Sequence, residues 1–229
     1  MVADPDTPTL DVVLLGPVGA GKGTQARRLA RIYHLLHLSS GDLLRDEVRH
    51  GTPLGKQAET FMANGDLVPD DLVVAMVLQR MRAPDGHAGA LLDGFPRTLV
   101  QAEALDRALA EGGRRLSRAL YLKVPEDVLL DRLAHRWTCP IDGTTYDERV
   151  NPPRTPGVCD NDGARLYQRP DDQPQVVAER IRVYLRNTEP VVDYYRARSI
   201  LVEVDGARDI DVVTADLTGA IQAAVEVHF

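Results

Sequence analysis

A glycine-rich loop directly after a short apolar run is the feature that most constrains this chain. The loop, GPVGAGKGT at 16–24, follows DVVLLG and precedes a segment whose apolar residues have helical spacing. It fits the phosphate-loop pattern G-x-x-x-x-G-K-[ST] at Gly16, Gly21 and Lys22. Gly23 stands where that pattern has Ser or Thr, however, and Thr24 comes one residue late. Strand, glycine loop and helix in this order predict an α/β sheet with an anion site at the loop.

The loop can bind phosphate through its backbone. Small residues let successive N–H groups converge on an anion, and the helix that follows adds the positive end of its dipole. Lys22 would then reach the terminal phosphates. The alternative is a glycine-rich turn without a ligand, which the flanking strand, the helix and the lysine together disfavour. The expected phosphate-binding positions are Gly19, Ala20, Gly21, Lys22, Gly23 and Thr24.

The rest of the chain alternates between apolar runs and helical patterns, which predicts a parallel sheet with right-handed crossovers. Further strands are expected at 35–38, within 89–96, at 118–125 and at 199–206. Helices are expected at 21–33, over 40–82 with breaks at 50–53 and 64–71, and at 97–113, 125–137, 173–198 and 209–227. The segment 138–172 is rich in Pro, Gly, Asp and Asn and interrupts this alternation, so it predicts a small inserted β-type domain.

Composition limits the classes of function. The formal net charge of −7 leaves no basic field over the whole protein, so a nucleic-acid binder is disfavoured. The N-terminal residues lack a signal-peptide pattern, and no run approaches the ~18 apolar residues of a membrane span. Two cysteines form no disulfide framework, which fits a reducing compartment. We therefore expect a cytoplasmic protein.

A second signal is LLDGFPR at 91–97. An acid at the carboxyl end of a parallel strand would lie beside the phosphate loop. Asp93 could hold Mg²⁺ there through water molecules, because magnesium gives up its hydration shell reluctantly. The alternative is an ordinary turn aspartate. Arg97 follows on the same rim.

With these blocks in view, the sequence resembles the adenylate kinases. The resemblance rests on GPVGAGKGTQ (16–25), SSGDLLR (39–45), LLDGFPRTLVQ (91–101), the stretch from DRLAHR (131–136) to LYQRPDD (166–172), and VDGAR (204–208). In that family GKGT replaces GK[ST], so Gly23 is the family's own variant. The resemblance covers all but about the first ten residues.

The resemblance implies a fold and a domain division. The fold is α/β, a five-stranded parallel phosphate-loop sheet with flanking helices. Its core would comprise 1–38, 69–134 and 173–229. A helical insert over AMP would comprise 39–68, and a small β-type lid over ATP would comprise 135–172. The reaction would be ATP + AMP ⇌ 2 ADP with Mg²⁺, catalysed by a monomer.

The resemblance also implies residue roles. Phosphate contacts and catalysis would fall to Lys22, Arg97, Arg132, Arg136, Arg169 and Arg180. The ATP base would be bordered by Arg132, Thr145, Tyr146 and the carbonyl of Arg208. AMP would be bound by Ser40, Arg45, Leu67, Val68, Gly94, Arg97, Gln101, Arg169 and Arg180. Gln101 would meet the adenine edge, because a carboxamide can donate and accept at once. Asp42 and Asp93 would hold water on Mg²⁺.

The lid contains two similar pairs, Cys139 with Asp142 and Cys159 with Asp162. Metal-bearing lids in the family have C-x2-C-x16-C-x2-C or Asp at the last position, whereas metal-free lids have hydrogen-bonded polar residues there. This pattern fits neither form. Zinc accepts thiolate and carboxylate ligands in a tetrahedron, so one hypothesis is structural Zn²⁺. The second is a hydrogen-bonded polar cluster, and the third, disfavoured in a reducing cell, is a disulfide between the two cysteines.

Three functions stay open from the sequence. Adenylate kinase is the first, and Gln101 favours AMP as its acceptor. A GTP:AMP phosphotransferase, or another nucleoside monophosphate kinase, is the second, because lid contacts identify the donor base less well. The third, from a different class, is an inactive nucleotide sensor, which would keep the loop and lose the arginines.

Overall fold

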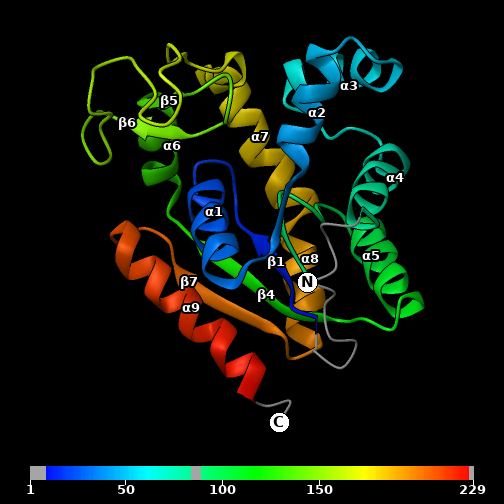
Figure 1. Cartoon of the computed structure of the whole chain (residues 1–229). Coiled ribbons are helices and arrows are strands. Elements are labelled where there is room, and N and C mark those ends of the chain that lie inside the picture. The colour runs from blue at the N-terminus through cyan, green and yellow to red at the C-terminus, as the bar shows by residue number, and fades with distance from the viewer. Residues whose placement is uncertain (1–8, 84–88, 227–229) are drawn as a thin grey trace.

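The computed structural model describes residues 9–83 and 89–226 of the chain. Its centre is a five-stranded, all-parallel sheet in the order β2-β3-β1-β4-β7 (Figure 1). The strands are β1 (Asp11–Leu15), β2 (Leu36–Ser39), β3 (Ala90–Asp93), β4 (Leu116–Lys123) and β7 (Leu201–Asp205). Parallel strands need crossover connections, and the helices of the chain supply them.

Helices cover both faces of the sheet because side chains alternate along each strand. From β1, Val12 and Leu14 pack toward one face with α1 (Lys22–Tyr33) and α9 (Ile210–Glu226), whereas Val13 and Leu15 pack toward the other. That second face is covered by α4 (Asp70–Met81), α5 (Leu99–Glu111) and α8 (Glu189–Ala197). Both faces of β1 are buried, which explains its apolar run from Val12 to Leu15.

Two groups of elements extend from one end of this core (Figure 1). The first follows β2 and consists of α2 (Ser40–Arg49) and α3 (Pro53–Asn64). The second lies between α6 (Glu126–Ala134) and α7 (Pro174–Asn187). It contains the antiparallel pair β5 (Arg136–Thr138) and β6 (Thr145–Asp147) and a 3-10 turn, η2 (Pro170–Asp172). We call residues 39–68 the helical insert and residues 135–172 the lid segment.

The fold class expected from the sequence is confirmed, and the five central strands lie within about two residues of the expected runs. One expected helix is in fact two: the stretch 173–198 divides into α7 and α8 at Thr188. Pro190 lies in the first turn of α8, where its missing N–H costs nothing. The last expected helix, 209–227, runs from Ile210 to Glu226 within the described residues. None of the described helices is both long and apolar enough to cross a membrane.

Candidate active site

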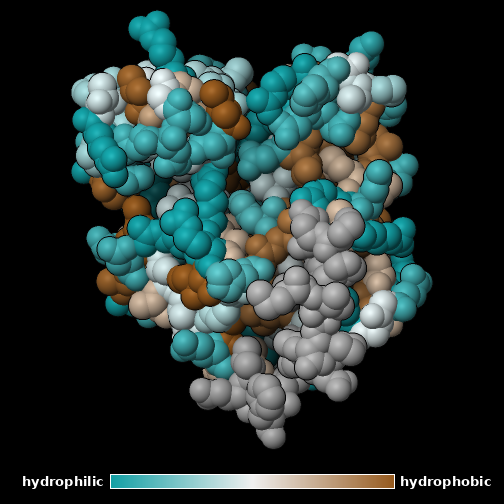
Figure 2. All heavy atoms as spheres, viewed as in Figure 1, coloured by the Kyte–Doolittle hydropathy of each residue, from teal (hydrophilic) through white to brown (hydrophobic). Residues whose placement is uncertain are grey.

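A cavity of about 630 Å³ opens where the carboxyl ends of the strands meet the lid segment and the helical insert. Figure 2 shows this region as a hollow between two lobes with mainly hydrophilic surfaces. The phosphate loop, the end of β3, α6, α7 and the lid segment all contribute to its lining. Ligands of open α/β sheets bind at this end of the strands.

The phosphate loop forms one wall of the cavity. Gly16 and Gly21 have φ angles of 146° and 90°, a region that favours glycine. A Cβ on Gly16 would lie 2.9 Å from the carbonyl oxygen of Leu122, so a side chain there would also clash with β4. α1 begins at Lys22, so its free backbone N–H groups face the loop.

Lys22 is held at the centre of this wall. Its ammonium donates to the carbonyl oxygens of Gly16 and Pro17, at 2.8 Å each. Burial lowers the pKa of Lys22 to about 8, and the positive charges of Arg97, Arg180 and Arg136 act in the same direction against Asp93. The structure thus concentrates positive charge where terminal phosphates would lie.

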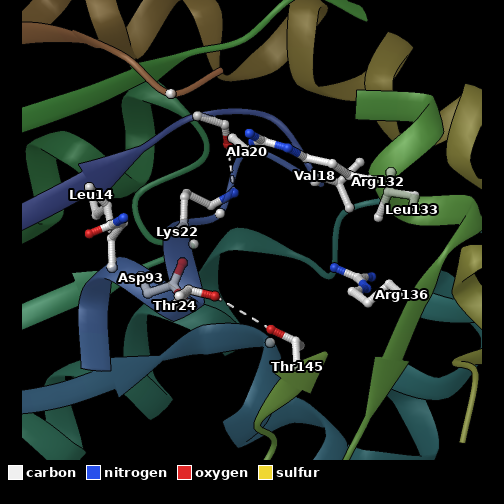
Figure 3. A pocket seen from close by; sticks show the side chains of 18 of the residues that line it. Leu14, Val18, Ala20, Lys22, Thr24, Asp93, Arg132, Leu133, Arg136 and Thr145 are labelled. Carbon is white, nitrogen blue, oxygen red and sulfur yellow. Dashed lines mark hydrogen bonds between the residues drawn. The ribbon is translucent and has the colours of Figure 1, made fainter. Parts of the chain in front are cut away.

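Asp93, the last residue of β3, lies beside Lys22 (Figure 3). Burial alone would raise the pKa of its carboxyl group, but His37 and the charge of Lys22 outweigh burial and hold it below its usual value. The carboxylate also faces the loop, since a Cβ built on Gly23 would lie 3.5 Å from Oδ2. A buried, ionised carboxylate beside the loop has the oxygen donors that Mg²⁺ prefers.

Arginines from four separate segments converge on the same cavity. Arg97 follows β3, Arg136 begins β5, Arg169 precedes η2 and Arg180 lies in α7. Burial lowers the pKa of Arg169 and of Arg180 to about 10. Like charges add to this effect, because Arg136 lies close enough to lower both values. Such a cluster needs an anionic partner to be stable.

Part of this positive charge is compensated by two acids that the sequence analysis did not single out. Arg180 pairs with Asp171 at 2.8 Å and with Asp172 at 3.6 Å, and Arg136 pairs with Asp172. Arg169 donates to the hydroxyl of Thr138 at 3.1 Å. Both acids lie in the RPDD run, whose sequence does not reveal which arginines they face.

A smaller cavity of about 60 Å³ adjoins the first under the helical insert. Its lining includes the expected AMP-site residues Ser40, Arg45, Leu67, Val68, Arg97, Gln101 and Arg180. Ser40 donates to the carbonyl of Gly94 at 2.6 Å. Arg45 pairs with Asp42, whose carboxylate is therefore engaged, whereas the carboxylate of Asp93 lies 3.8 Å from Nε2 of His37.

The expected base-binding residues also line the larger cavity: Arg132 from α6, Thr145 and Tyr146 from the lid segment, and Arg208, which follows β7. The hydroxyls of Thr24 and Thr145 lie 3.5 Å apart, as the dashed line in Figure 3 marks. Arg27, a residue that sequence reasoning missed, donates to the carbonyl oxygens of Gly23 and Gly143. The lid segment is therefore in contact with the phosphate loop and α1.

Comparisons with known proteins agree with this geometry. The family model described as adenylate kinase matches residues 14–200, well over half of the chain. The chain belongs to the adenylate kinase family. Among curated relatives, the adenylate kinase of Moorella thermoacetica is 48% identical over 88% of this chain and 93% of its own length. Those of Archaeoglobus fulgidus and Brevibacillus brevis are 45% and 43% identical over 93% of this chain, and over 98% and 100% of their own lengths.

Adenylate kinases are phosphotransferases that use Mg²⁺ with ATP, so the chain is an enzyme of this class. This membership also explains why Gly23 stands in place of the usual Ser or Thr. Every residue expected at the nucleotide sites lines one of the two cavities. The role of each residue stays a prediction.

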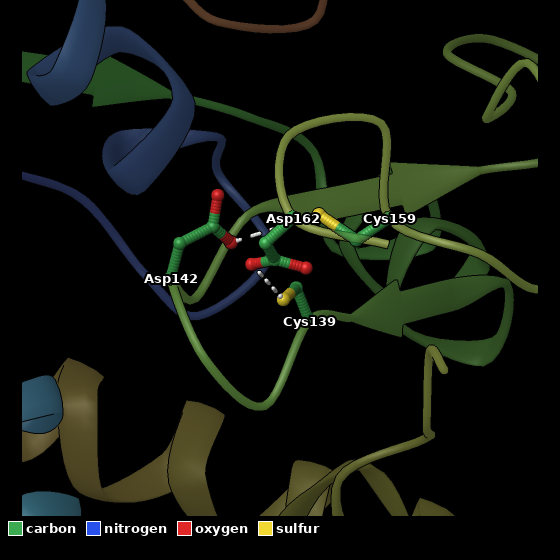
Figure 4. Close-up of side chains that lie close together, drawn as sticks. All are labelled: Cys139, Asp142, Cys159 and Asp162. Carbon is green, nitrogen blue, oxygen red and sulfur yellow. Dashed lines mark hydrogen bonds between the residues drawn. The ribbon is translucent and has the colours of Figure 1, made fainter. Parts of the chain in front are cut away.

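The lid segment of the enzyme holds a separate cluster, Cys139, Asp142, Cys159 and Asp162 (Figure 4). One ligand atom from each residue lies within 4.8 Å of the others. The Cys139 thiol contacts Asp162 at 3.1 Å, and the Cys159 thiol lies 4.0 Å from Asp142. Both cysteines are free and buried.

Two matching turns build this cluster, CPIDG and CDNDG. In each, the glycine N–H donates to the cysteine carbonyl, Gly143 at 3.1 Å and Gly163 at 3.0 Å. The carboxylates are oriented by backbone N–H groups two residues on, from Thr144 at 2.8 Å and from Ala164 at 2.9 Å. Two thiols and two oriented carboxylates at this separation fit a tetrahedral zinc site.

Proposed function

We propose that the larger cavity binds MgATP, that the smaller one binds AMP, and that the γ-phosphoryl group passes between them to give two ADP. The observation that carries this proposal is the convergence of five cationic side chains on the larger cavity, two of which, Arg97 and Arg180, also line the smaller one. The five are Lys22, Arg97, Arg136, Arg169 and Arg180. The domain division follows the same scheme. The helical insert covers AMP, the lid segment covers ATP, and the remaining residues form the core.

The reaction needs no general base. The accepting phosphate oxygen is already largely ionised near neutral pH, because its second pKa is about 6. The obstacle is repulsion between two polyphosphates, which fixed cations and alignment overcome. Lys22 and the arginines would screen this repulsion and stabilise the charge on the transferring group.

The donor nucleotide would lie along the phosphate loop. Backbone N–H groups from Gly19 to Thr24 would bind its phosphates. Arg132 would stack on the adenine, which Thr145, Tyr146 and the carbonyl of Arg208 would border.

The acceptor nucleotide would lie under the helical insert. Arg45 and Arg97 would bind the AMP phosphate. Ser40, Leu67, Val68 and Gly94 would line its pocket, and Gln101 would meet the base.

Asp93 is the main candidate for orienting the water molecules of Mg²⁺, with Asp42 as its partner. Mg²⁺ supplies charge neutralisation and alignment of the donor phosphates. The buried Asp93 carboxylate stays ionised and faces the loop, which suits this role. Asp42 would have to leave its ion pair with Arg45, a change that an AMP phosphate bound to Arg45 would favour.

We further propose that the lid segment binds one structural Zn²⁺ through Cys139, Asp142, Cys159 and Asp162. Zinc would cross-link the two turns and take no part in phosphoryl transfer. Elemental analysis of dialysed protein tests this proposal, and a content well below one zinc per chain would favour the hydrogen-bonded cluster instead.

The nucleotide assignment is tested by incubating the protein with Mg²⁺, AMP and either ATP or GTP, and measuring the diphosphates formed. ADP from ATP plus AMP supports the assignment. Faster turnover with GTP would identify the alternative donor, and no turnover would favour the nucleotide sensor. Lys22→Ala should lower kcat by about two orders of magnitude or more, whereas Lys123→Ala, at an exposed lysine outside both cavities, should leave it unchanged.

Localisation and assembly complete the proposal. We assign the enzyme to the cytoplasm, because its two free cysteines suit a reducing compartment. We also assign it as a monomer, the state that its resemblance to the adenylate kinases implies. Analytical ultracentrifugation at micromolar concentration tests the monomer.

A further inference from the structure

The carboxamide of Gln101 is held on two sides. The side chain is 1% exposed and lines the smaller cavity. Its Oε1 accepts from the backbone N–H of Arg97 at 2.7 Å, and its Nε2 donates to Oδ1 of Asp70 at 2.8 Å. Gln101 and Asp70 are 31 residues apart in the chain, so the fold brings them together.

These two partners permit one orientation of the amide. The Arg97 N–H can only donate and an ionised Asp70 carboxylate can only accept, so turning the amide by 180° would put donor against donor and acceptor against acceptor. Asp70 is itself held, because the hydroxyl of Thr98 donates to its Oδ2 at 3.0 Å. Asp70 lines neither cavity, so it acts behind Gln101 rather than on a ligand.

The orientation matters because the two kinds of purine have opposite edges. A 6-aminopurine presents a donor at N6 beside an acceptor at N1, whereas a 6-oxopurine presents an acceptor at O6 beside a donor at N1. A freely turning carboxamide can match either edge, but a fixed one matches only one. Gln101 keeps one N–H and one oxygen lone pair that are not used by Asp70 and Arg97.

We propose that Asp70 is a positioning residue that fixes the Gln101 carboxamide and thereby makes the acceptor site select 6-aminopurine over 6-oxopurine monophosphates. The proposal rests on the assignment of the smaller cavity to AMP. A site that hydrogen-bonds both edge atoms rejects the reversed edge strongly, because its buried polar groups are then left opposed.

The test replaces Asp70 by Asn, which has nearly the same shape. An Asn side chain can turn either its oxygen or its NH₂ toward Gln101, so both orientations of the Gln101 amide become available on that side. Asp71→Asn is the matched control, since it removes the same charge from the same helical turn at an exposed position. The readout is the ratio of kcat/KM for AMP to that for IMP, with ATP as donor.

The ratio should fall about tenfold in Asp70→Asn, which corresponds to about 1.4 kcal/mol of discrimination. It should keep its wild-type value in Asp71→Asn. Both substrates are measured on one sample, so partial unfolding lowers both rates equally and leaves the ratio intact.

Two results would overturn the proposal: an unchanged ratio in Asp70→Asn, or an equal fall in both variants. The Gln101→Ala variant distinguishes a wrong role for Asp70 from a wrong assignment of the smaller cavity to AMP. If Gln101→Ala lowers the ratio while Asp70→Asn does not, Gln101 reads the base without help from Asp70. If the wild-type protein does not phosphorylate AMP, the assignment of the site is wrong, and this inference fails with it.

Discussion

Raising the pH from 7 to 9 should weaken binding of a nucleoside triphosphate through one side chain, Lys22. Burial lowers its pKa to about 8, against an ordinary value of 10.5, so it loses its charge within this range while the arginines stay charged. A bound triphosphate favours the charged form and raises this pKa again. Binding above pH 8 must therefore take up a proton, and affinity must fall as pH rises.

The size of the effect follows from the pKa. With a value of about 8, roughly three quarters of the free enzyme lacks this proton at pH 8.5, so binding should take up about 0.7 proton there and about 0.1 at pH 7. The association constant should fall about tenfold between pH 7 and pH 9. Isothermal titration calorimetry with a non-hydrolysable MgATP analogue, in two buffers of different ionisation enthalpy, measures both quantities.

Lys22→Arg is the control, because a guanidinium keeps its charge over this range. It should show no proton uptake, whatever its affinity. Uptake near zero in the wild-type protein at pH 8.5, or an association constant that stays flat to pH 9, would show that Lys22 is already charged in the free enzyme. The argument from burial would then be refuted.

Three further changes have defined outcomes. Arg97→Ala should raise the KM for AMP at least tenfold with little effect on the KM for ATP, and a loss confined to ATP would mean that the two cavities are assigned in reverse. Gly55→Ala would put a Cβ 2.1 Å from a backbone carbonyl oxygen of α2, so it should destabilise the protein by about 1–3 kcal/mol or more in thermal unfolding. Gly219→Ala, in the open interior of α9, should instead be neutral or stabilise it by up to about 1 kcal/mol. Cys159→Ser should abolish zinc binding and lower the melting temperature. Asp160→Asn, next to the cluster, should leave the zinc content and the melting temperature unchanged. Zinc retained in Cys159→Ser would exclude that thiol as a ligand.

The sequence predicts the fold well because its signals are local. The run DVVLLG is buried on both faces, and the glycine loop needs the backbone angles that Gly16 and Gly21 adopt. Both features can be recognised within ten residues. The prediction of one long helix was wrong at Thr188. Proline is tolerated in the first turn of a helix but not in its interior, so Pro190 begins a new helix there.

Only part of the site could be predicted from the sequence. The residues that were not predicted interact with partners that are far away in the sequence. Arg27 contacts Gly143 over 116 positions, and no local pattern identifies an arginine in a helix as a partner of a distant loop. Asp172 belongs to the LYQRPDD motif, yet its ion pair with Arg136 forms only because the fold of the lid segment brings its two ends together. Resemblance to a family predicts which residues lie at the substrate sites, whereas the residues that orient those side chains are identified only from the structure.

If the larger cavity binds ATP as proposed, its crowded cations make the stability of the folded state depend on nucleotide. Buried positive charges such as Arg169 and Arg180 lie close to others of the same sign, which penalises the empty fold. A bound polyphosphate removes that penalty, and any ligand at 100 times its Kd adds about 2.7 kcal/mol to stability by mass action. A cell with abundant ATP therefore keeps this enzyme more stable than dialysed protein in a calorimeter, and its resistance to unfolding would fall as adenine nucleotides are depleted.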